Sequence, residues 1–569
     1  MGVKEREPGF GREDGVRDDL VVVLARAREA VRGRVRGDAR ARVAGHQWSR
    51  LRHHRAGGLA ERHDQDRDEH DDERRASRVG HVGPPKYTQP VMRGGADYFA
   101  SLRDGRAIFL DGKRVDDVTT HPAFAESLRR IAERYDAARH ARDVTTCLDP
   151  ATGRTIGAMW LIPRSAEDLG RRRAVHRFWA EGSYGLMGRT PDHVASVLTA
   201  FAGWRQLFDR ADRRFGDNVV RFYEKARDED LYVAYAIVPP QVDRGTPAHR
   251  HREPFIHPGV VKDTDAGIVI RGAHAIATSV TMADWLYVSY ITPLAPGDTD
   301  YAISLVMPVN APGLRLLPRR PYATLATSVY DYPLSARYDE VDTTVVFDDV
   351  VVPWEHVFVY KNVELVTAQF HESPAHVTAN FQSLVRFGVK LELLAGLAAK
   401  LAEVQGGDGD PVTQATLGGD IAAFCAAFDG LTKAAERHPL ISEGYARPHP
   451  QYVYAGMSLQ RRIIVDLYRT VRELAGGAFQ NMPSSEASFL SSETGPVTER
   501  YYQSAASGAR DRVKLLKLIW DFIGSEYGGR QLQYEMFYSA AQPVVNRRMY
   551  RAYDWRSAKA MVDRLLGEY

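Results

Sequence analysis

The sequence predicts an α+β protein in which an N-terminal helical domain precedes a central β domain and a C-terminal four-helix bundle with a tail. Three observations support this order. Apolar residues recur at helical spacing between residue 92 and about 230, apolar and polar residues alternate from about 231, and helical spacing returns after about 362. We therefore expect domains at 92–230, 231–362 and 363–569.

Residues 1–91 differ in composition from the rest of the chain. Stretches such as RGRVRGDARARVAG and ERHDQDRDEHDDERRASR mix both charge signs with Gly, Ala and His, and aromatic residues are scarce. Such a composition buries too little apolar surface to offset the entropy lost on ordering. We expect 1–91 to be a disordered extension, dispensable for the folding and activity of the remainder, which begins at Met92.

Amphipathic runs predict the helices of the first domain. HPAFAESLRRIAERYDAARH and AEDLGRRRAVHRFWAEGSYGLM each place apolar side chains on one face. The segment GRTPDHV predicts the start of a third helix. Thr190 suits the N-cap, Pro191 the first helical position and Asp192 the positive end of the helix dipole. Helix-start chemistry leaves Arg189 and His193 unexplained.

Alternating segments predict the strands of the β domain. They are LYVAYAIV, VVKDTDAGIVIRGAHAIATSV (two strands across an Asp-Ala-Gly turn), DWLYVSYIT, YAISLVMPV and TTVVFDDVVVPWEHVFV. Four long helices are expected beyond residue 365, in VRFGVKLELLAGLAAKLAEV, IAAFCAAFDGLTKAAERH, QRRIIVDLYRTVRELAGG and DRVKLLKLIWDFIGSEYGGRQLQYEMFY.

Charge and composition exclude several classes of function. The formal net charge is +3, and its excess of Lys and Arg lies within 1–91, so the main body lacks the basic surface that nucleic-acid binding needs. No apolar run reaches membrane-spanning length, and LVVVLA is too short for a signal peptide. Cys147 and Cys425 cannot form a disulfide framework or hold an iron–sulfur cluster. We expect a cytoplasmic protein that binds neither membrane nor nucleic acid.

Common catalytic and cofactor motifs are missing. The sequence has no GxGxxG after a strand, no GxxxxGK[ST], no GxSxG, and neither HExxH nor CxxC. The pair His249 and His251 lies in a charged loop without a carboxylate at ligand spacing, so we expect a solvated loop and no metal site. A nicotinamide dinucleotide site of the Rossmann type is not expected.

Two polar loops next to the first strands could bind a flat ligand. AIVPPQVDRG presents Gln241 and Arg244 at i, i+3, an amide and a guanidinium suited to a heterocycle or a phosphate. The alternative is an ordinary polar loop in which Arg244 pairs with a nearby Asp. In RGAHAIATSVTMADW, Thr278 and Ser279 end a strand with hydroxyl groups, which alone is a weak signal.

Taken together, these segments resemble the flavin-dependent 4-hydroxyphenylacetate 3-hydroxylase family, the oxygenase components of two-component monooxygenases. The resemblance runs from about Gly94 to the C-terminus and includes YFASLRDGRAIFLDGKRVDDVTTHPAF, GRTPDHV, PPQVDRG, GIVIRGAHAIATS, VVFDDVVVPWEHVF and GSEYGGRQLQYEMFY, in that order. It implies an acyl-CoA dehydrogenase-like fold and a homotetramer. The extension before Met92 has no counterpart.

The resemblance also implies residue roles in catalysis. Arg189 would face the phenolic oxygen of the substrate, and His193 and Tyr235 would line the same pocket. Hydroxyphenylacetate hydroxylases carry Tyr and His at those two positions, so the substrate is left open. Arg189 would stabilise the phenolate, and His193 or Tyr235 would take up or relay its proton, with His193 the better poised near neutral pH.

A second set of residues would hold the flavin. Gln241, Arg244 and Thr278 match flavin-binding positions, and Tyr235 borders that set as well. Weaker matches, for which ordinary C-capping or close helix packing is the alternative, are Gly476, Gly477, Gly528 and Arg530.

The function expected from this resemblance is aromatic hydroxylation ortho to a phenolic OH, using O2 and reduced FAD from a separate flavin reductase. One alternative is a flavin oxidoreductase of the acyl-CoA dehydrogenase type, which needs a carboxylate base. The others are an oxygenase acting on a non-phenolic ring, one acting on an aromatic amino acid tethered to a carrier protein, and a non-enzymatic helical scaffold.

Overall fold

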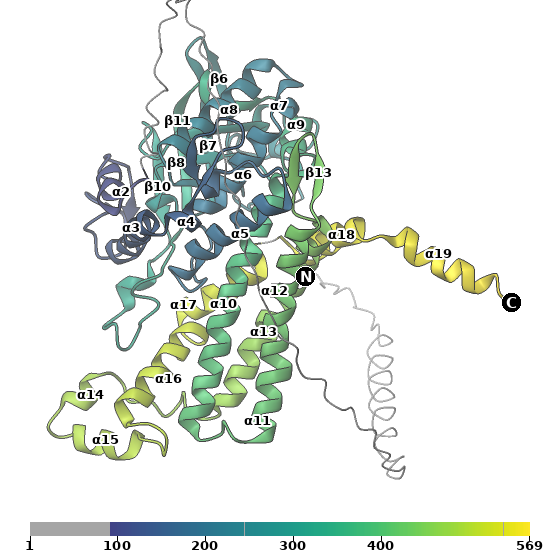
Figure 1. The fold of residues 1–569 in the computed structure, drawn as a ribbon. Coiled ribbons are helices and arrows are strands. Elements are labelled where there is room, and N and C mark those ends of the chain that lie inside the picture. Colours follow the sequence, from purple (N-terminus) through teal and green to yellow (C-terminus); the bar gives the residue numbers. More distant parts are fainter. Residues whose placement is uncertain (1–91, 244, 539) are drawn as a thin grey trace, which may run out of the picture. The chain divides into compact units, whose positions relative to one another are not determined.

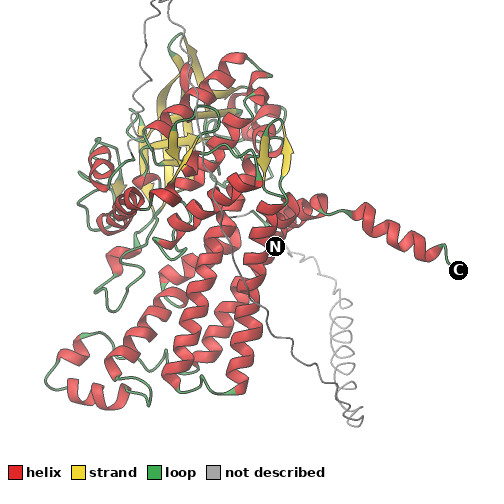
Figure 2. Cartoon of the chain, viewed as in Figure 1, coloured by secondary structure: helices red, strands yellow, loops and turns green. Residues whose placement is uncertain are grey.

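The computed structural model describes residues 92–243, 245–538 and 540–569. The expected extension at 1–91 and the candidate flavin residue Arg244 lie outside the described residues. Helices lead, strands follow and long helices close the chain (Figures 1 and 2). The predicted α+β organisation is confirmed.

Helices of 4 to 16 residues and two small hairpins form the N-terminal part. The predicted apolar face of α3 is buried, including Leu128, Ile131 and Tyr135. The helices are α2 (Gly95–Ser101), α3 (Ala125–His140), α4 (Arg142–Thr145), α5 (Ala166–Glu181), α6 (Pro191–Gly203), α7 (Gln206–Asp209) and α8 (Arg213–Asp228). The hairpins, which the helical pattern did not predict, pair β1 (Phe109–Leu110) with β2 (Lys113–Arg114) and β3 (Thr146–Leu148) with β4 (Thr155–Gly157).

Two four-stranded sheets form the central part. One has the order β10-β11-β7-β6 and is antiparallel; the other has the order β12-β9-β8-β5, with β5 and β8 parallel. Their strands are β5 (Val233–Ala236), β6 (Gly259–Thr264), β7 (Gly267–Thr278), β8 (Trp285–Val288), β9 (Ile303–Pro308), β10 (Leu314–Pro318), β11 (Asp342–Pro353) and β12 (Val357–Tyr360). The Asp-Ala-Gly turn joins β6 to β7 as predicted.

Long helices dominate the C-terminal part, where α10, α12 and α13 lie side by side (Figure 1). The helices are α9 (Val363–His371), α10 (Ala375–Gln405), α11 (Pro411–Thr416), α12 (Ala423–Arg437), α13 (Pro450–Ala475), α14 (Ala487–Leu490), α15 (Gly495–Tyr502), α16 (Ala509–Ile523), α17 (Glu526–Phe537), α18 (Gln542–Ala552) and α19 (Trp555–Leu566). A hairpin of β13 (Leu440–Ser442) and β14 (Tyr445–Arg447) separates α12 from α13. None of the helices in the described residues is long and apolar enough to span a membrane.

The helix predicted over DRVKLLKLIWDFIGSEYGGRQLQYEMFY is two helices, α16 and α17. The break falls at Gly524 and Ser525, where the Ser525 hydroxyl accepts a hydrogen bond from the backbone N–H of Gly528 at 3.0 Å. Serine at an N-cap competes well with helix continuation, and glycine before it weakens the first helix. The break matters because it sets the direction of α17, which faces the start of α6.

The start of α6 is enclosed by protein. Every residue from Pro191 to Ala202 is buried, and α6 packs on α10, α8 and β5. An amphipathic surface helix would expose one face. The polar side chains at the start of α6 therefore lie inside the molecule.

Candidate active site

The loop before α6 places Arg189 among three tyrosines. Its guanidinium carbon lies 5.1 Å from the ring centre of Tyr235 on β5, 5.3 Å from that of Tyr534 on α17 and 5.4 Å from that of Tyr538. Nη1 donates to the Tyr534 hydroxyl at 2.5 Å and to the carbonyl of Gly188 at 3.3 Å. Arg189 is only 8% exposed, so this cation is held in a largely dehydrated setting.

Within the described residues, no carboxylate forms an ion pair with the Arg189 side chain. Its Nε and Nη2 atoms have no hydrogen-bond partner there, and they are not among the fully buried polar atoms. Burial opposes the charge, but Tyr235, Tyr534 and Glu340 outweigh it and raise the pKa of Arg189 above its usual value. A buried cation without a counter-ion is costly, so this edge is suited to an anionic ligand.

His193 lies beside Tyr235, with ring centres 5.4 Å apart. Its Nδ1 lies 3.0 Å from Oε1 of Gln382, an acceptor, so Nδ1 donates and Nε2 keeps its lone pair. The Gln382 amide in turn donates to Asp192 at 3.2 Å. Burial, reinforced by Arg189, lowers the pKa of His193 well below its usual value. The expectation that His193 is poised near neutral pH is thus not met, since the ring stays neutral there.

Buried polar contacts fix the first turn of α6. The Thr190 hydroxyl donates to Asp192 at 2.6 Å and does not cap the helix backbone, contrary to the cap chemistry expected there. Nδ1 of His176 lies 2.8 Å from the other carboxylate oxygen of Asp192. Asp192 therefore serves as an anchor for the residues that hold His193.

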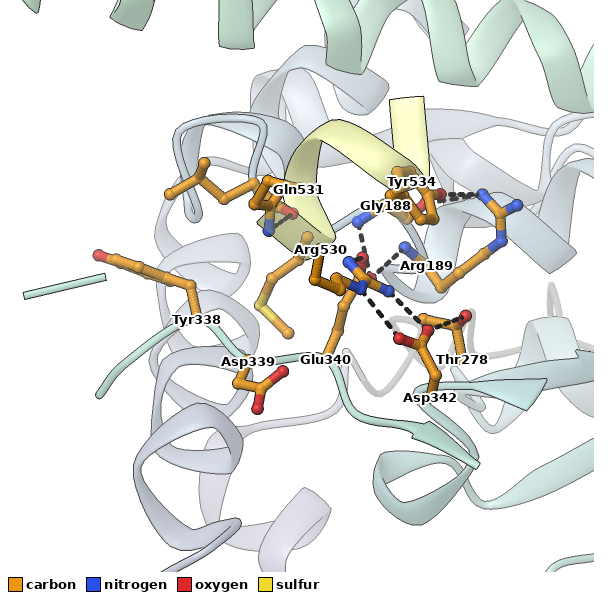
Figure 3. A network of polar contacts seen from close by, with 12 residues as sticks. Gly188, Arg189, Thr278, Tyr338, Asp339, Glu340, Asp342, Arg530, Gln531 and Tyr534 are labelled. Atoms are coloured by element: carbon orange, nitrogen blue, oxygen red, sulfur yellow. Dashed lines mark hydrogen bonds and ion pairs between the residues drawn. The ribbon is translucent and has the colours of Figure 1, made fainter. Parts of the chain in front are cut away.

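Glu340, just before β11, ties the Arg189 loop to α17 (Figure 3). One carboxylate oxygen accepts the backbone N–H groups of Gly188 at 2.7 Å and Arg189 at 2.8 Å, and the other accepts Nη1 of Arg530 at 2.7 Å. Glu340 is fully buried. The Arg189 backbone is consequently fixed by a charge-assisted contact.

The candidate flavin residues Thr278 and Arg530 meet at Asp342. Arg530 binds this carboxylate through Nε at 2.9 Å and Nη2 at 2.7 Å, and the Thr278 hydroxyl donates to it at 2.8 Å. Thr278 and Asp342 are cross-strand partners of β7 and β11, so their side chains share one face. Arg530 and Arg319 hold the pKa of Asp342 far below its usual range despite burial, and it stays ionised.

The remaining candidates are not joined to this network by these contacts. Gln241 is exposed in the loop after β5. Gly476 ends α13 with a φ of +54°, which favours glycine, and Gly477 is exposed. At Gly528 a Cβ would lie 2.6 Å from the carbonyl oxygen of Phe522, so glycine is needed for the close turn between α16 and α17.

Sequence reasoning missed several residues of this cluster: Gln382, Glu340, Asp342, Tyr534 and Tyr538. The stretch YDEVDTT offered a signal, because acids directly before a buried strand are costly without partners. Tyr534 on α17 and Tyr538, the residue that caps the C-terminal end of α17, are spaced i, i+4, and their rings stack.

Models of one protein family match almost all of the described chain. The model of the 4-hydroxyphenylacetate 3-hydroxylase N terminal region matches residues 94–359, and that of the C terminal region matches residues 366–567. The chain belongs to this family. The enzyme is the oxygenase component of a two-component FAD-dependent aromatic monooxygenase.

Individual relatives cover the same region. A Streptomyces globisporus monooxygenase, named for a 3-amino-3-(3-chloro-4-hydroxyphenyl)propanoyl group on a peptidyl-carrier protein, is 36% identical over 79% of this chain and 85% of its own. The 4-hydroxyphenylacetate 3-monooxygenase oxygenase component of Thermus thermophilus is 32% identical over 84% and 98%. A crystal structure of such a component complexed with FAD matches with a TM-score of 0.78 at 32% identity, over 84% of this chain and 98% of the other.

Proposed function

We propose that this oxygenase hydroxylates a phenolic ring ortho to its OH group, with O2 and with reduced FAD delivered by a separate flavin reductase. The observation that carries the proposal is the buried guanidinium of Arg189, which has no carboxylate partner in the described residues and presents a free Nε–Nη2 edge. A phenolate oxygen supplies the missing negative charge.

In this proposal Arg189, His193 and Tyr235 each have a separate role towards the phenol. Arg189 stabilises the phenolate, and an ionised phenol has the electron-rich ortho carbon that hydroxylation needs. His193 is neutral, and its Nε2 accepts the hydrogen bond of the phenol O–H. Tyr235, whose ring lies beside both groups, bounds the substrate ring and offers its hydroxyl for passing the proton onward.

The residues near Thr278 are suited to a flavin. The Thr278 hydroxyl donates its proton to Asp342, so its lone pairs would be available to accept a hydrogen bond from a bound flavin. Gln241, together with Arg244 from the same motif and Tyr235, completes the proposed set. The charge of Arg530 is balanced by Glu340 and Asp342, so its part is to hold this framework. When bound, reduced FAD supplies two electrons to O2, so that one oxygen atom becomes the new ring hydroxyl and the other becomes water.

A phenolic substrate is favoured over a non-phenolic ring. The names of two relatives, the Streptomyces globisporus enzyme and a 4-nitrophenol 2-monooxygenase oxygenase component of Rhodococcus sp, both contain a phenol. A ring without an ionisable hydroxyl would leave Arg189 without a counter-ion. Whether the phenol is free or tethered to a carrier protein is decided by comparing the two forms as substrates.

The dehydrogenase alternative does not fit the monooxygenase family to which the chain belongs. It needs a carboxylate free to remove a proton, and the buried Glu340 is fully engaged by two backbone N–H groups and Arg530. The homotetramer implied by the family resemblance remains a prediction, as does docking of a flavin reductase.

Replacement of Arg189 tests the proposal. Arg189→Met should bind FAD as wild type does and lose hydroxylation by roughly 10²–10³-fold, with O2 reduced to hydrogen peroxide instead. Arg189→Lys keeps the charge without the planar fork and should retain intermediate activity. The measurements are FAD titration, product mass and peroxide yield over a panel of phenols with a flavin reductase. Wild-type hydroxylation by Arg189→Met would reject the proposal.

A further inference from the structure

Tyr534 occupies an unusual position on α17, because three guanidinium groups surround its ring. The guanidinium carbons of Arg530, Arg189 and Arg386 lie 4.7, 5.3 and 5.5 Å from its ring centre. The ring stacks on Tyr538 at 5.2 Å with an angle of 8° between planes. Tyr534 is 9% exposed, so its orientation is set by these neighbours.

Two of these cations have carboxylate partners. Arg530 pairs with Glu340 and Asp342, and Arg386 pairs with Glu535. The third, Arg189, has neutral acceptors instead: the Tyr534 hydroxyl and a backbone carbonyl. Within the described residues, Arg189 is therefore the guanidinium beside Tyr534 that forms no ion pair with a carboxylate.

Tyr534 binds Arg189 without cancelling its charge. Burial raises the pKa of the Tyr534 hydroxyl well above its usual value, although Arg189 and Arg386 act in the opposite direction. The hydroxyl thus remains a neutral acceptor. A carboxylate in its place would neutralise the guanidinium and compete with an anionic ligand.

The contact also selects which side of Arg189 is free. Nη1 is fully used by Tyr534 and Gly188, whereas Nε and Nη2 keep their protons available. Close approach of Tyr534 requires glycine at position 188, where a Cβ would lie 2.0 Å from the tyrosine hydroxyl oxygen.

We propose that Tyr534 is a positioning residue that holds Nη1 of Arg189 and thereby turns the Nε–Nη2 edge towards the phenolate oxygen of the substrate. The inference rests on the proposed function, because it requires Arg189 to bind the phenolate. Without the Tyr534 hydroxyl, Nη1 becomes a buried donor with one acceptor too few, and the guanidinium turns to satisfy it. The phenolate then loses part of its stabilisation.

The pKa of a bound phenol reports this directly. We suggest 4-nitrophenol as the probe, because only its phenolate is yellow, and the full chain with oxidised FAD, which does not turn over. The pH at which the bound probe ionises is read as an absorbance difference from the same holoenzyme without probe. Wild type should lower the probe's pKa relative to free probe, and Tyr534→Phe should raise it again by about one unit, a tenfold loss of preference for the phenolate.

Tyr538→Phe is the matched control. Its ring is as near to Arg189 as that of Tyr534, but its hydroxyl donates to Gln460 at 3.0 Å and accepts no hydrogen bond from Arg189. The bound probe should therefore ionise in Tyr538→Phe as in wild type. A Tyr534→Phe variant that also matches wild type would overturn the inference.

The variant Arg189→Met separates this inference from the proposed function. If Arg189→Met ionises the probe as wild type does, or if wild type does not lower the probe's pKa, the proposed function fails. If Arg189→Met raises that pKa and Tyr534→Phe does not, only the inference fails. Should Tyr534→Phe not fold, Gly188→Ala displaces the same hydroxyl from Arg189 and must raise the probe's pKa for the inference to stand.

Discussion

The carboxylate of Glu340 accepts the backbone N–H of Arg189 at 2.8 Å, although 151 residues separate the two in the chain. A backbone contact of this kind fixes where the arginine side chain starts and leaves its charge unneutralised. The second oxygen of Glu340 is bound to Arg530, so one buried carboxylate connects the loop before α6 with α17. Glu340 therefore determines the geometry of the site without being a candidate for its chemistry.

Glu340→Gln should destabilise the protein by about 3–5 kcal/mol, because removal of one partner leaves the buried Arg530 insufficiently compensated and puts an amide N–H against a donor. The measurement is the urea midpoint of unfolding. Asp348→Asn removes the carboxylate of an exposed ion pair with Arg315 and is the control. It should leave that midpoint unchanged, since exposed pairs contribute little. Equal effects of the two substitutions would contradict the role of Glu340.

The flavin set is tested by affinity. Thr278→Val and Gln241→Leu each remove a neutral hydrogen-bonding group and should raise the dissociation constant for reduced FAD by roughly threefold to tenfold, whereas Arg244→Met should raise it by about tenfold or more. Thr432→Val makes the same change on α12, where the hydroxyl donates to the Phe428 carbonyl, and should leave the affinity unchanged. Anaerobic titration of folded variants gives the constants. If Gln241→Leu and Arg244→Met bind as wild type does, PPQVDRG is an ordinary polar loop.

The fold was readable from the sequence where its causes are local. The turn between β6 and β7 and the apolar face of α3 depend on residues close in sequence, and both are present in the structure. The break before Ser525 was not predicted. Apolar residues recur at helical spacing on both sides of it, and this pattern was given more weight than the N-cap signal of Ser525.

The site was only partly readable. The resemblance pointed to Arg189, His193 and Tyr235, and the structure places them together. Their partners Glu340 and Tyr534 lie 151 and 345 residues from Arg189, so no spacing rule finds them. The low pKa of His193 likewise depends on burial and on Arg189, which are tertiary features.

Buried histidines predict that stability falls as pH falls. Burial lowers the pKa of His274 to about 3 and also lowers the pKa of other rings: His176, His193 and His376. Below about pH 6.5 the unfolded chain takes up protons that the folded chain does not, so the free energy of unfolding decreases as pH decreases. Each histidine contributes up to about 1.4 kcal/mol per pH unit.

The window for this measurement is about pH 7.5 to 6. Burial raises the pKa of Asp230 to about 6. Below that pH the folded state also takes up a proton, which opposes the loss of stability caused by the histidines. The urea midpoint of wild type should fall as the pH is lowered across this window. In His274→Phe the midpoint should fall less steeply, because the unfolded variant takes up about one proton fewer than unfolded wild type. A midpoint independent of pH in wild type would show that these rings titrate alike in both states.

The last prediction concerns the two pocket positions where this chain departs from hydroxyphenylacetate hydroxylases. His193 is 4% exposed and its ring centre lies 5.4 Å from that of Tyr235, so the two positions are in contact and must be changed together. In His193→Tyr/Tyr235→His, the larger ring enters the buried position and the bond to Gln382 is lost. The acceptor on α6 becomes a hydroxyl that titrates near 10.

The double variant should therefore lose activity on the phenol that wild type prefers and gain activity on simple 4-hydroxyphenyl acids. A water-excluded pocket penalises a polar group left without a partner, which makes the change larger than ring size alone would give. Product formation is measured for wild type, both single variants and the double variant on the same panel of phenols, with added reductase. The single variants show whether the two positions are coupled. If all four proteins rank the panel alike, His193 and Tyr235 do not set specificity, and the preference for one phenol over another arises elsewhere in the pocket.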